Sequence, residues 1–222
     1  MSSSIGCHLV GVALGDDQGA EHVLGHVEPG GAALAGERAG RDELLRLRAQ
    51  GRGDFFNGFE SMHHRKDGGM VGCMLEDRLT HQITCDGVHV AAPWIKLLIK
   101  LKGIDKIYGI TDLFNFAGLE DGEYDNDFYG TVVISGPRCC AKKDGMLLGG
   151  NLTWDKMMKS ARDTIGLSEI EVAKIYGENP CKCLGITDRG KIEVGRRSDF
   201  CIMDKDYHVQ KTIIKGKIYY QI

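Results

Sequence analysis

The chain has 222 residues, of which 42% are hydrophobic and 27% are charged, and its formal net charge at pH 7 is −3. This composition indicates a globular protein large enough for one full domain, and the small negative charge argues against a nucleic-acid partner. No apolar run approaches the roughly 18 residues of a membrane helix, and no signal-peptide pattern opens the chain. We therefore expect a cytoplasmic protein that has no membrane partner and acts on a small molecule.

The 8 cysteines occur as an adjacent pair, a Cys-X-Cys sequence and scattered single residues. Neither cluster has the paired spacing of a structural zinc site. We expect reduced thiols rather than disulfides, in keeping with a cytoplasmic protein.

Residues 1–53 and 54–222 differ in their basic residues. The first part contains five arginines and no lysine, whereas the second contains sixteen lysines and seven arginines. This change predicts a boundary at residue 54. Within the first part, residues 41–50 have the pattern of a short amphipathic helix.

A strand, a helix and a second strand are predicted over residues 80–112. Residues 80–87 and 106–112 have the pattern of strands, and residues 92–103 that of a helix. The helix should turn its apolar residues towards one side, namely Trp94, Ile95, Leu97, Leu98 and Leu101. A βαβ unit of this kind builds a parallel sheet or a barrel.

Two carboxylates, Asp86 and Asp112, stand at the carboxyl ends of these predicted strands. Ligands of parallel α/β folds bind at that edge, so both residues are candidates for a functional site. The alternative is that each side chain only accepts backbone N–H bonds in its own turn.

Further helices are predicted over residues 151–166 and 167–180. The second opens on Ser168 with Glu171 three residues later, which is the pattern of a capping box. Residues 190–195, 198–204 and 209–222 form short β runs separated by turns, and these predict a small β appendage at the end of the chain.

Five segments, taken in order, resemble the N-acetylglucosamine-6-phosphate deacetylases, a family of metal-dependent amidohydrolases. They are DFFNGFESMHHRKDGGMVG (54–72), CDGVHV (85–90), GITDLFNFAGLEDGEYD (109–125), KKDGMLLGGNLTWD (142–155) and NPCKCLGITDRGKIEVGRRSDFCIMD (179–204). The resemblance covers the carboxyl-terminal half of that family. It implies removal of the acetyl group from N-acetylglucosamine 6-phosphate by a homodimer.

The fold implied by the resemblance is α/β: a partial TIM-like (β/α) barrel of the amidohydrolase type with a small C-terminal β appendage. A complete barrel takes about 250 residues, so we expect the early strands to be missing. The implied division is a poorly matched segment 1–53, a barrel-derived catalytic domain 54–190 and a small β-sandwich portion 191–222.

The resemblance also assigns site residues. Asp112 corresponds to the catalytic residue, and Arg65 to an arginine that reaches the sugar phosphate in a neighbouring subunit, where a planar guanidinium suits phosphate. The other substrate-binding positions are Asn57, Gly58, Asp86, Gly87, Val88, His89, Leu147, Leu148 and Gly149. The last three match a loop that closes on the acetyl end of the substrate.

The predicted cofactor is a divalent metal ion, zinc or a similar ion. His26 matches a metal-binding histidine of the family, and Asp54 stands where the family has another. Aspartate can ligate such ions through oxygen. Val10 stands where the family has a metal-binding glutamate, and valine cannot serve as a ligand.

Two other readings remain open at the level of sequence. One is a non-catalytic, truncated relative that binds sugar phosphate, which the substitutions at residues 10 and 54 favour. The other is a different amidohydrolase, such as a dihydroorotase-like enzyme or an amino-acid deacylase, although Arg65 in its phosphate-binding context argues against it.

Overall fold

The protein is described from a computed structural model that places residues 8–10, 56, 64–65 and 69–222. The predicted helix over residues 41–50 therefore lies outside the described residues. So do four of the predicted site residues, His26, Asp54, Asn57 and Gly58.

The predicted βαβ unit is confirmed. Strand β2 (His81–Thr84) leads through α3 (Ala92–Lys102) and a short 3-10 turn (Ile104–Lys106) to β3 (Ile107–Ile110). The two strands pair in parallel, with His81 opposite Ile107, and α2 (Gly69–Leu75) packs beside α3. The carboxyl ends of β2 and β3 therefore lie side by side, as the sequence predicted for Asp86 and Asp112.

The apolar side of α3 is narrower than predicted. Ile95 and Leu98 are fully buried, but Trp94, Leu97 and Leu101 are 42%, 37% and 48% exposed. At 100° per residue the five side chains cover an arc wider than the surface that a neighbouring element can bury. Trp94 is instead covered in part by the ring of Phe56, whose centroid lies 6.1 Å away.

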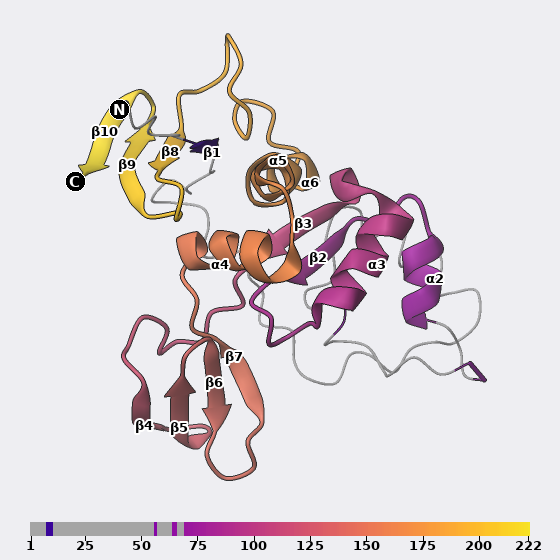
Figure 1. Cartoon of the computed structure of the whole chain (residues 1–222), viewed down its shortest axis with the longest axis vertical. Helices are drawn as coiled ribbons and strands as arrows, with labels where there is room; N and C mark the ends of the chain where they lie inside the picture. The colour runs from indigo at the N-terminus through magenta and orange to yellow at the C-terminus, as the bar shows by residue number, and fades with distance from the viewer. Residues whose placement is uncertain (1–7, 11–55, 57–63, 66–68) are drawn as a thin grey trace, which may run out of the picture.

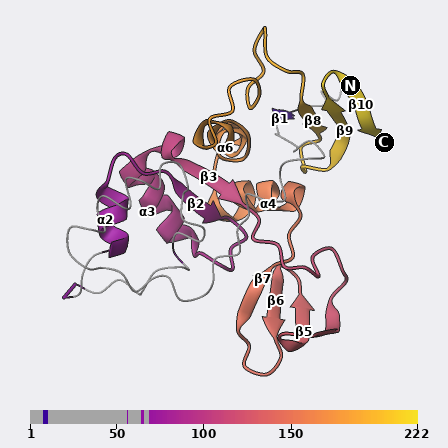
Figure 2. The ribbon, with the colours of Figure 1, turned by 180° about the vertical axis from the view of Figure 1, so that it is seen from behind.

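An antiparallel sheet that the sequence analysis did not predict follows β3. It has the order β4 (Gly122–Asn126), β5 (Gly130–Ser135), β6 (Arg138–Ala141) and β7 (Leu147–Gly150). Val132, Ile134 and Cys139 form its own small core. Figures 1 and 2 show the sheet as a separate layer on one side of α4, with the C-terminal strands on the other side.

The two helices predicted after this sheet are present, each continued by a π-helical turn. They run through α4 (Trp154–Ser160) into Ala161–Ile165, and through α5 (Glu169–Ala173) and Lys174–Glu178 into α6 (Asn179–Cys183). The capping box is confirmed, because Ser168 N donates to Glu171 Oε2 at 2.8 Å and Glu171 N donates to Ser168 Oγ at 3.3 Å. The second helix continues past Pro180, which occupies the start of α6, where the missing N–H is tolerated.

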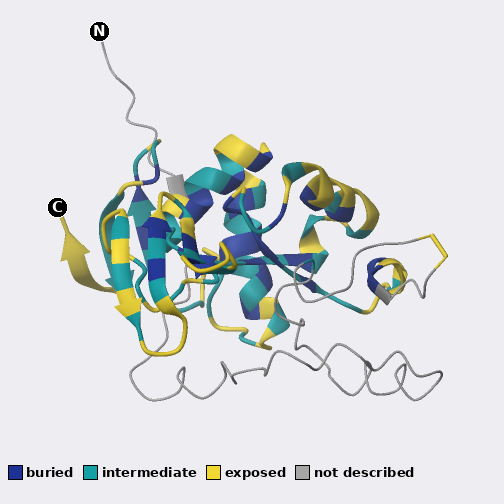
Figure 3. Cartoon of the chain, turned by 90° about the horizontal axis from the view of Figure 1, so that it is seen from below, coloured by how far each residue is buried: buried dark blue, intermediate teal, exposed yellow. Residues whose placement is uncertain are grey.

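The C-terminal β appendage is an antiparallel sheet with the order β1 (His8–Val10), β8 (Phe200–Met203), β9 (Val209–Ile214) and β10 (Lys217–Gln221). The β run predicted over residues 190–195 is wrong. That segment forms turns, in which Arg196 N donates to Glu193 O at 3.1 Å and Val194 is fully exposed. The edge strand β10, next to the C-terminus in Figure 3, is exposed along its whole length.

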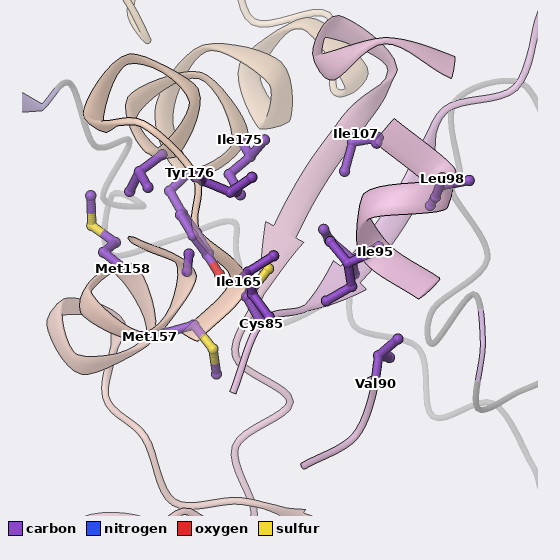
Figure 4. Packing of buried hydrophobic residues seen from close by; sticks show 14 of the residues in the cluster. Cys85, Val90, Ile95, Leu98, Ile107, Met157, Met158, Ile165, Ile175 and Tyr176 are labelled. Carbon is purple, nitrogen blue, oxygen red and sulfur yellow. The ribbon is translucent and has the colours of Figure 1, made fainter. Parts of the chain in front are cut away.

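The main core lies between the βαβ unit and the helices that follow the antiparallel sheet. Ile83, Ile95 and Ile107 come from the first group and meet Met157 and Tyr176 from the second. Figure 4 shows Ile95, Ile107, Met157 and Tyr176 gathered between α3, β3 and the later helices. This packing fixes the strand ends that carry the acidic residues relative to the rest of the fold.

The described part of the chain is mixed α/β. Its cysteines, residues 73, 85, 139, 140, 181, 183 and 201, form no disulfide with one another. Among the described residues, no helix has the length and apolar character needed to cross a membrane.

Candidate active site

Asp86, His89 and Asp112 form a chain of close contacts at the carboxyl ends of β2 and β3. Asp86 Oδ2 lies 2.5 Å from His89 Nδ1, and His89 Nε2 lies 3.0 Å from Asp112 Oδ2. The side chains of Asp86 and His89 are 0% and 4% exposed, whereas that of Asp112 is 36% exposed. The structure thus brings three predicted site residues together, with Asp112 at the solvent-accessible end.

The turn after β2 places His89 over Asp86. Asp86 Oδ1 accepts hydrogen bonds from Val88 N at 2.8 Å and from His89 N at 2.9 Å, and Gly87 adopts the left-handed conformation with φ 75°. An aspartate that accepts backbone N–H groups two and three residues later commonly closes such a turn. Asp86 therefore does more than accept backbone N–H bonds in its own turn, because Oδ1 caps the turn and Oδ2 contacts His89. Its functional role stays a prediction.

The two carboxylates keep His89 protonated. Burial by itself lowers the pKa of His89, but the hydrogen bonds and charges of Asp112 and Asp86 outweigh it and raise the pKa to about 9. Burial also acts to raise the pKa of Asp86, and the hydrogen bonds from His89 and Val88 more than offset it. At neutral pH the group is a cation held between two carboxylates, with both ring nitrogens donating.

Asp112 is the member of this group that a ligand can reach. Its backbone adopts a left-handed conformation, with φ 47°, which is uncommon for a residue other than glycine. A carboxylate held by a buried cation and open to solvent on its other side can accept a proton from a water molecule. This chemistry suits hydrolysis.

The predicted substrate-binding residues Leu147, Leu148 and Gly149 form most of strand β7 rather than a loop, which corrects that part of the prediction. Burial explains the difference, because Gly149 is buried and Leu148 packs against the small core of the antiparallel sheet. The strand nevertheless lies beside the candidate site, since Gly150 N donates to Asp112 O at 2.7 Å.

Arg65 is exposed and lies in the short turn 64–65, which Figures 1 and 3 show at the end of the molecule beyond α2. The sequence resemblance implies that this arginine reaches the substrate of a neighbouring subunit, so its role stays a prediction. Of the other predicted site residues, Asn57, Gly58, His26 and Asp54 are not among the described residues.

The described residues of this site do not by themselves fit a divalent metal. Both ring nitrogens of His89 contact carboxylates, and both oxygens of Asp86 accept hydrogen bonds. Within the described ranges, no group of three or more His, Cys, Asp or Glu residues could hold a metal ion. Val10, which the resemblance matches to a metal-binding glutamate, lies in β1 opposite Cys201 of the C-terminal sheet.

Sequence reasoning missed an aromatic cluster beside Asp112. The Phe114 ring lies 5.6 Å from that of Phe116 and 5.9 Å from that of Tyr129, and Tyr124 lies 5.9 Å from Phe116. These residues join the loop after β3 to the antiparallel sheet. The β-branched apolar run 132–134 before the Gly136-Pro137 turn was the signal that could have revealed the sheet.

Comparison with known proteins supports the resemblance. Residues 129–219 match the model of the amidohydrolase family. An N-acetylglucosamine-6-phosphate deacetylase from Bacillus subtilis (strain 168) is 31% identical over 197 residues, which cover 88% of this chain and 47% of that protein. A putative N-acetylgalactosamine-6-phosphate deacetylase from Escherichia coli (strain K12) is 29% identical over 170 residues, covering 73% of this chain and 96% of that protein.

A solved structure is also similar to this chain. The crystal structure of N-acetylglucosamine-6-phosphate deacetylase from Thermotoga maritima superposes with a TM-score of 0.70 at 32% identity, covering 82% of this chain and 50% of that one. The chain thus spans about half the length of the Bacillus subtilis and Thermotoga maritima proteins that it matches. Its resemblance to N-acetylglucosamine-6-phosphate deacetylases is confirmed.

Proposed function

We propose that this chain is a hydrolase of the amidohydrolase type that removes the acetyl group from N-acetylglucosamine 6-phosphate, giving glucosamine 6-phosphate and acetate, in amino-sugar catabolism. The observation that carries the proposal is the contact of His89 Nε2 with Asp112 Oδ2 at 3.0 Å, at the end of two parallel strands. The names of the Bacillus subtilis and Thermotoga maritima relatives support the substrate and the reaction.

In the proposed reaction Asp112 is the general base. Water attacks the acetyl carbon, Asp112 takes the proton of that water, and the proton passes to nitrogen as the C–N bond breaks. His89 holds the carboxylate in place through Nε2, and Asp86 holds His89 through Nδ1. The partial exposure of the Asp112 side chain leaves room for the water and the acetyl group to approach.

The substrate is proposed to bind across two subunits of a homodimer. Arg65 would contact the phosphate held by the partner subunit, where its planar guanidinium can form two parallel hydrogen bonds. We propose that the sugar and the acetyl group contact three parts of the chain: the turn 86–89 after β2, strand β7, and residues 57–58. The residues concerned are Asn57, Gly58, Asp86, Gly87, Val88, His89, Leu147, Leu148 and Gly149.

The remaining features of the proposal rest on the resemblance and on composition. We propose a partial TIM-like (β/α) barrel over residues 54–190, a small β-sandwich portion over 191–222 and a cytoplasmic location. We also propose a divalent metal, zinc or a similar ion, with His26 and Asp54 as ligands. The match to the amidohydrolase family model and the resemblance to its metal-dependent members support this part of the proposal.

Release of acetate from N-acetylglucosamine 6-phosphate tests the proposal. Purified chain with added zinc should release acetate, and Asp112→Asn should abolish the release by removing the base. Asp127→Asn is the matched control, because Asp127 is an exposed carboxylate in the turn between β4 and β5. N-acetylgalactosamine 6-phosphate is assayed in parallel, because one relative bears that name.

A second candidate is a non-catalytic chain that binds sugar phosphate. The observations that favour it are Val10 and Asp54 in place of two metal-binding residues of the family, and a described site without a metal cluster. In that case titration calorimetry would detect binding of glucosamine 6-phosphate by a folded chain, and no acetate would be released with zinc, manganese or cobalt present.

A further inference from the structure

Asp112 is held in an unfavourable backbone conformation. Its φ of 47° lies in the left-handed region, which is strained for a residue with a Cβ. Such a conformation persists only when the surrounding structure fixes it from several sides. The contacts that fix Asp112 therefore bear on how its side chain reaches His89.

Strand β7 supplies these contacts through its backbone. Gly150 N donates to Asp112 O at 2.7 Å, and Phe114 N donates to Gly150 O at 3.0 Å. Leu113, between them, forms a parallel bridge with Gly150. The edge of the antiparallel sheet thus holds the three residues from Asp112 to Phe114 by hydrogen bonds on both sides of Leu113.

This close approach requires two adjacent glycines. A Cβ on Gly149 would stand 3.0 Å from Asp112 O and 3.2 Å from Phe114 N. A Cβ on Gly150 would stand 3.1 Å from Thr111 O and 3.7 Å from Asp86 Oδ2. Most of these neighbours are backbone atoms, which cannot turn away as the end of a flexible side chain can.

We infer that β7 is a positioning strand, in which Gly149 and Gly150 hold Asp112 in its left-handed conformation and so place Asp112 Oδ2 against His89 Nε2. The catalytic meaning of this role rests on the proposed function, but the positioning itself does not. The antiparallel sheet, which lies outside the βαβ unit, thereby becomes part of the acid–base machinery. Gly149, expected to contact substrate, acts through Asp112.

The test is Gly149→Ala, compared with Gly122→Ala. Gly122 lies in β4 of the same sheet, and a Cβ there would meet only the Tyr124 ring, no nearer than 3.5 Å, which is an ordinary contact. Circular dichroism and thermal unfolding establish that both variants fold. The first readout is the titration of the His89 ring by nuclear magnetic resonance, which needs neither metal nor turnover.

Gly149→Ala should weaken the Asp112 contact and reduce the proton affinity of His89 by about tenfold. Gly122→Ala should leave the titration of His89 as it is in the parent chain. In acetate release, Gly149→Ala should lower kcat by about tenfold to a hundredfold with KM within about twofold. A residue that only binds substrate would raise KM and leave kcat unchanged.

An unchanged His89 titration in folded Gly149→Ala would overturn the inference, as would an equal change in both variants. Should Gly149→Ala not fold, Gly150→Ala takes its place, because its Cβ meets backbone at 3.1 Å without a strained φ at Gly150. A parent chain that releases no acetate would count against the proposed function alone, because the His89 titration still decides the positioning role.

Discussion

The ring of Tyr176 packs against Gly109 so closely that a Cβ built on Gly109 would stand 2.2 Å from Tyr176 Cε1. Gly109 is in β3, and Tyr176 is fully buried in the π-helical turn Lys174–Glu178. The contact packs the π-helical turn between α5 and α6 directly against strand β3. It depends on the absence of a side chain at one position of β3.

Gly109→Ala should therefore destabilise the fold by about 3 kcal/mol, because neither the strand nor the buried ring can move without repacking. Urea denaturation followed by circular dichroism measures the change in the free energy of unfolding. Gly72→Ala is the matched control, since Gly72 lies in α2 with no atom within 4 Å of its added Cβ. That change should stabilise by about 0.5–1 kcal/mol. Equal destabilisation by both changes would contradict the packing described.

The pairing of His89 with Asp86 and Asp112 should make stability depend on pH. The folded pKa of about 9 is above the ordinary value of 6.5, so the stabilisation is complete below about pH 6.5 and is lost as pH rises through about 9. The stability difference between the parent chain and His89→Gln should be about 3 kcal/mol larger at pH 6 than at pH 9.5. Urea denaturation at both pH values measures it.

His208→Gln is the control for the His89 experiment. His208 also contacts a carboxylate, with Nδ1 lying 3.1 Å from Asp204 Oδ2, but its side chain is 70% exposed. Solvent screens such a pair, so its removal should change stability little at either pH. A His89→Gln effect that is the same at pH 6 and pH 9.5 would show that folding does not raise the pKa of His89.

Asp112→Asn should lower the pKa of His89. Asp112 provides one of the two carboxylates that raise this pKa, while burial opposes them, so removing its charge leaves Asp86 alone against burial. The titration of the His89 ring by nuclear magnetic resonance measures the change. Asp127→Asn, at an exposed position in the turn between β4 and β5, should leave the titration unaltered. Indistinguishable curves for the two variants would rule out the 3.0 Å contact in solution.

His81 should make the folded chain less stable at acid pH, whereas the contribution of His89 is lost at alkaline pH. Burial, and to a lesser extent the charge of Lys102, lowers the pKa of His81 to about 4. The unfolded chain therefore binds a proton near pH 6.5 that the folded chain does not, and stability falls as pH decreases from about 6.5 to about 4. His81→Gln should flatten this part of the stability profile. If the stability of His81→Gln falls as steeply between pH 6.5 and pH 4 as that of the parent chain, titratable groups other than His81 cause the loss of stability at acid pH.

The sequence by itself determined the elements whose signals are local. The βαβ pattern located β2, α3 and β3, and it placed Asp86 and Asp112 at neighbouring strand ends. The capping box at Ser168 and Glu171 marked the start of α5. These features could be predicted because hydrophobic period, capping and parallel crossover depend on residues close together in the chain.

Only the tertiary structure decided which surfaces meet. Trp94, Leu97 and Leu101 share a helix with Ile95 and Leu98, but burial depends on what packs against each side. The contact between Gly149 and Asp112 joins β7 to the loop after β3 through backbone atoms, and the two residues are 37 positions apart. No local pattern encodes such an approach, because it depends on where the antiparallel sheet docks and on the space that a missing side chain leaves.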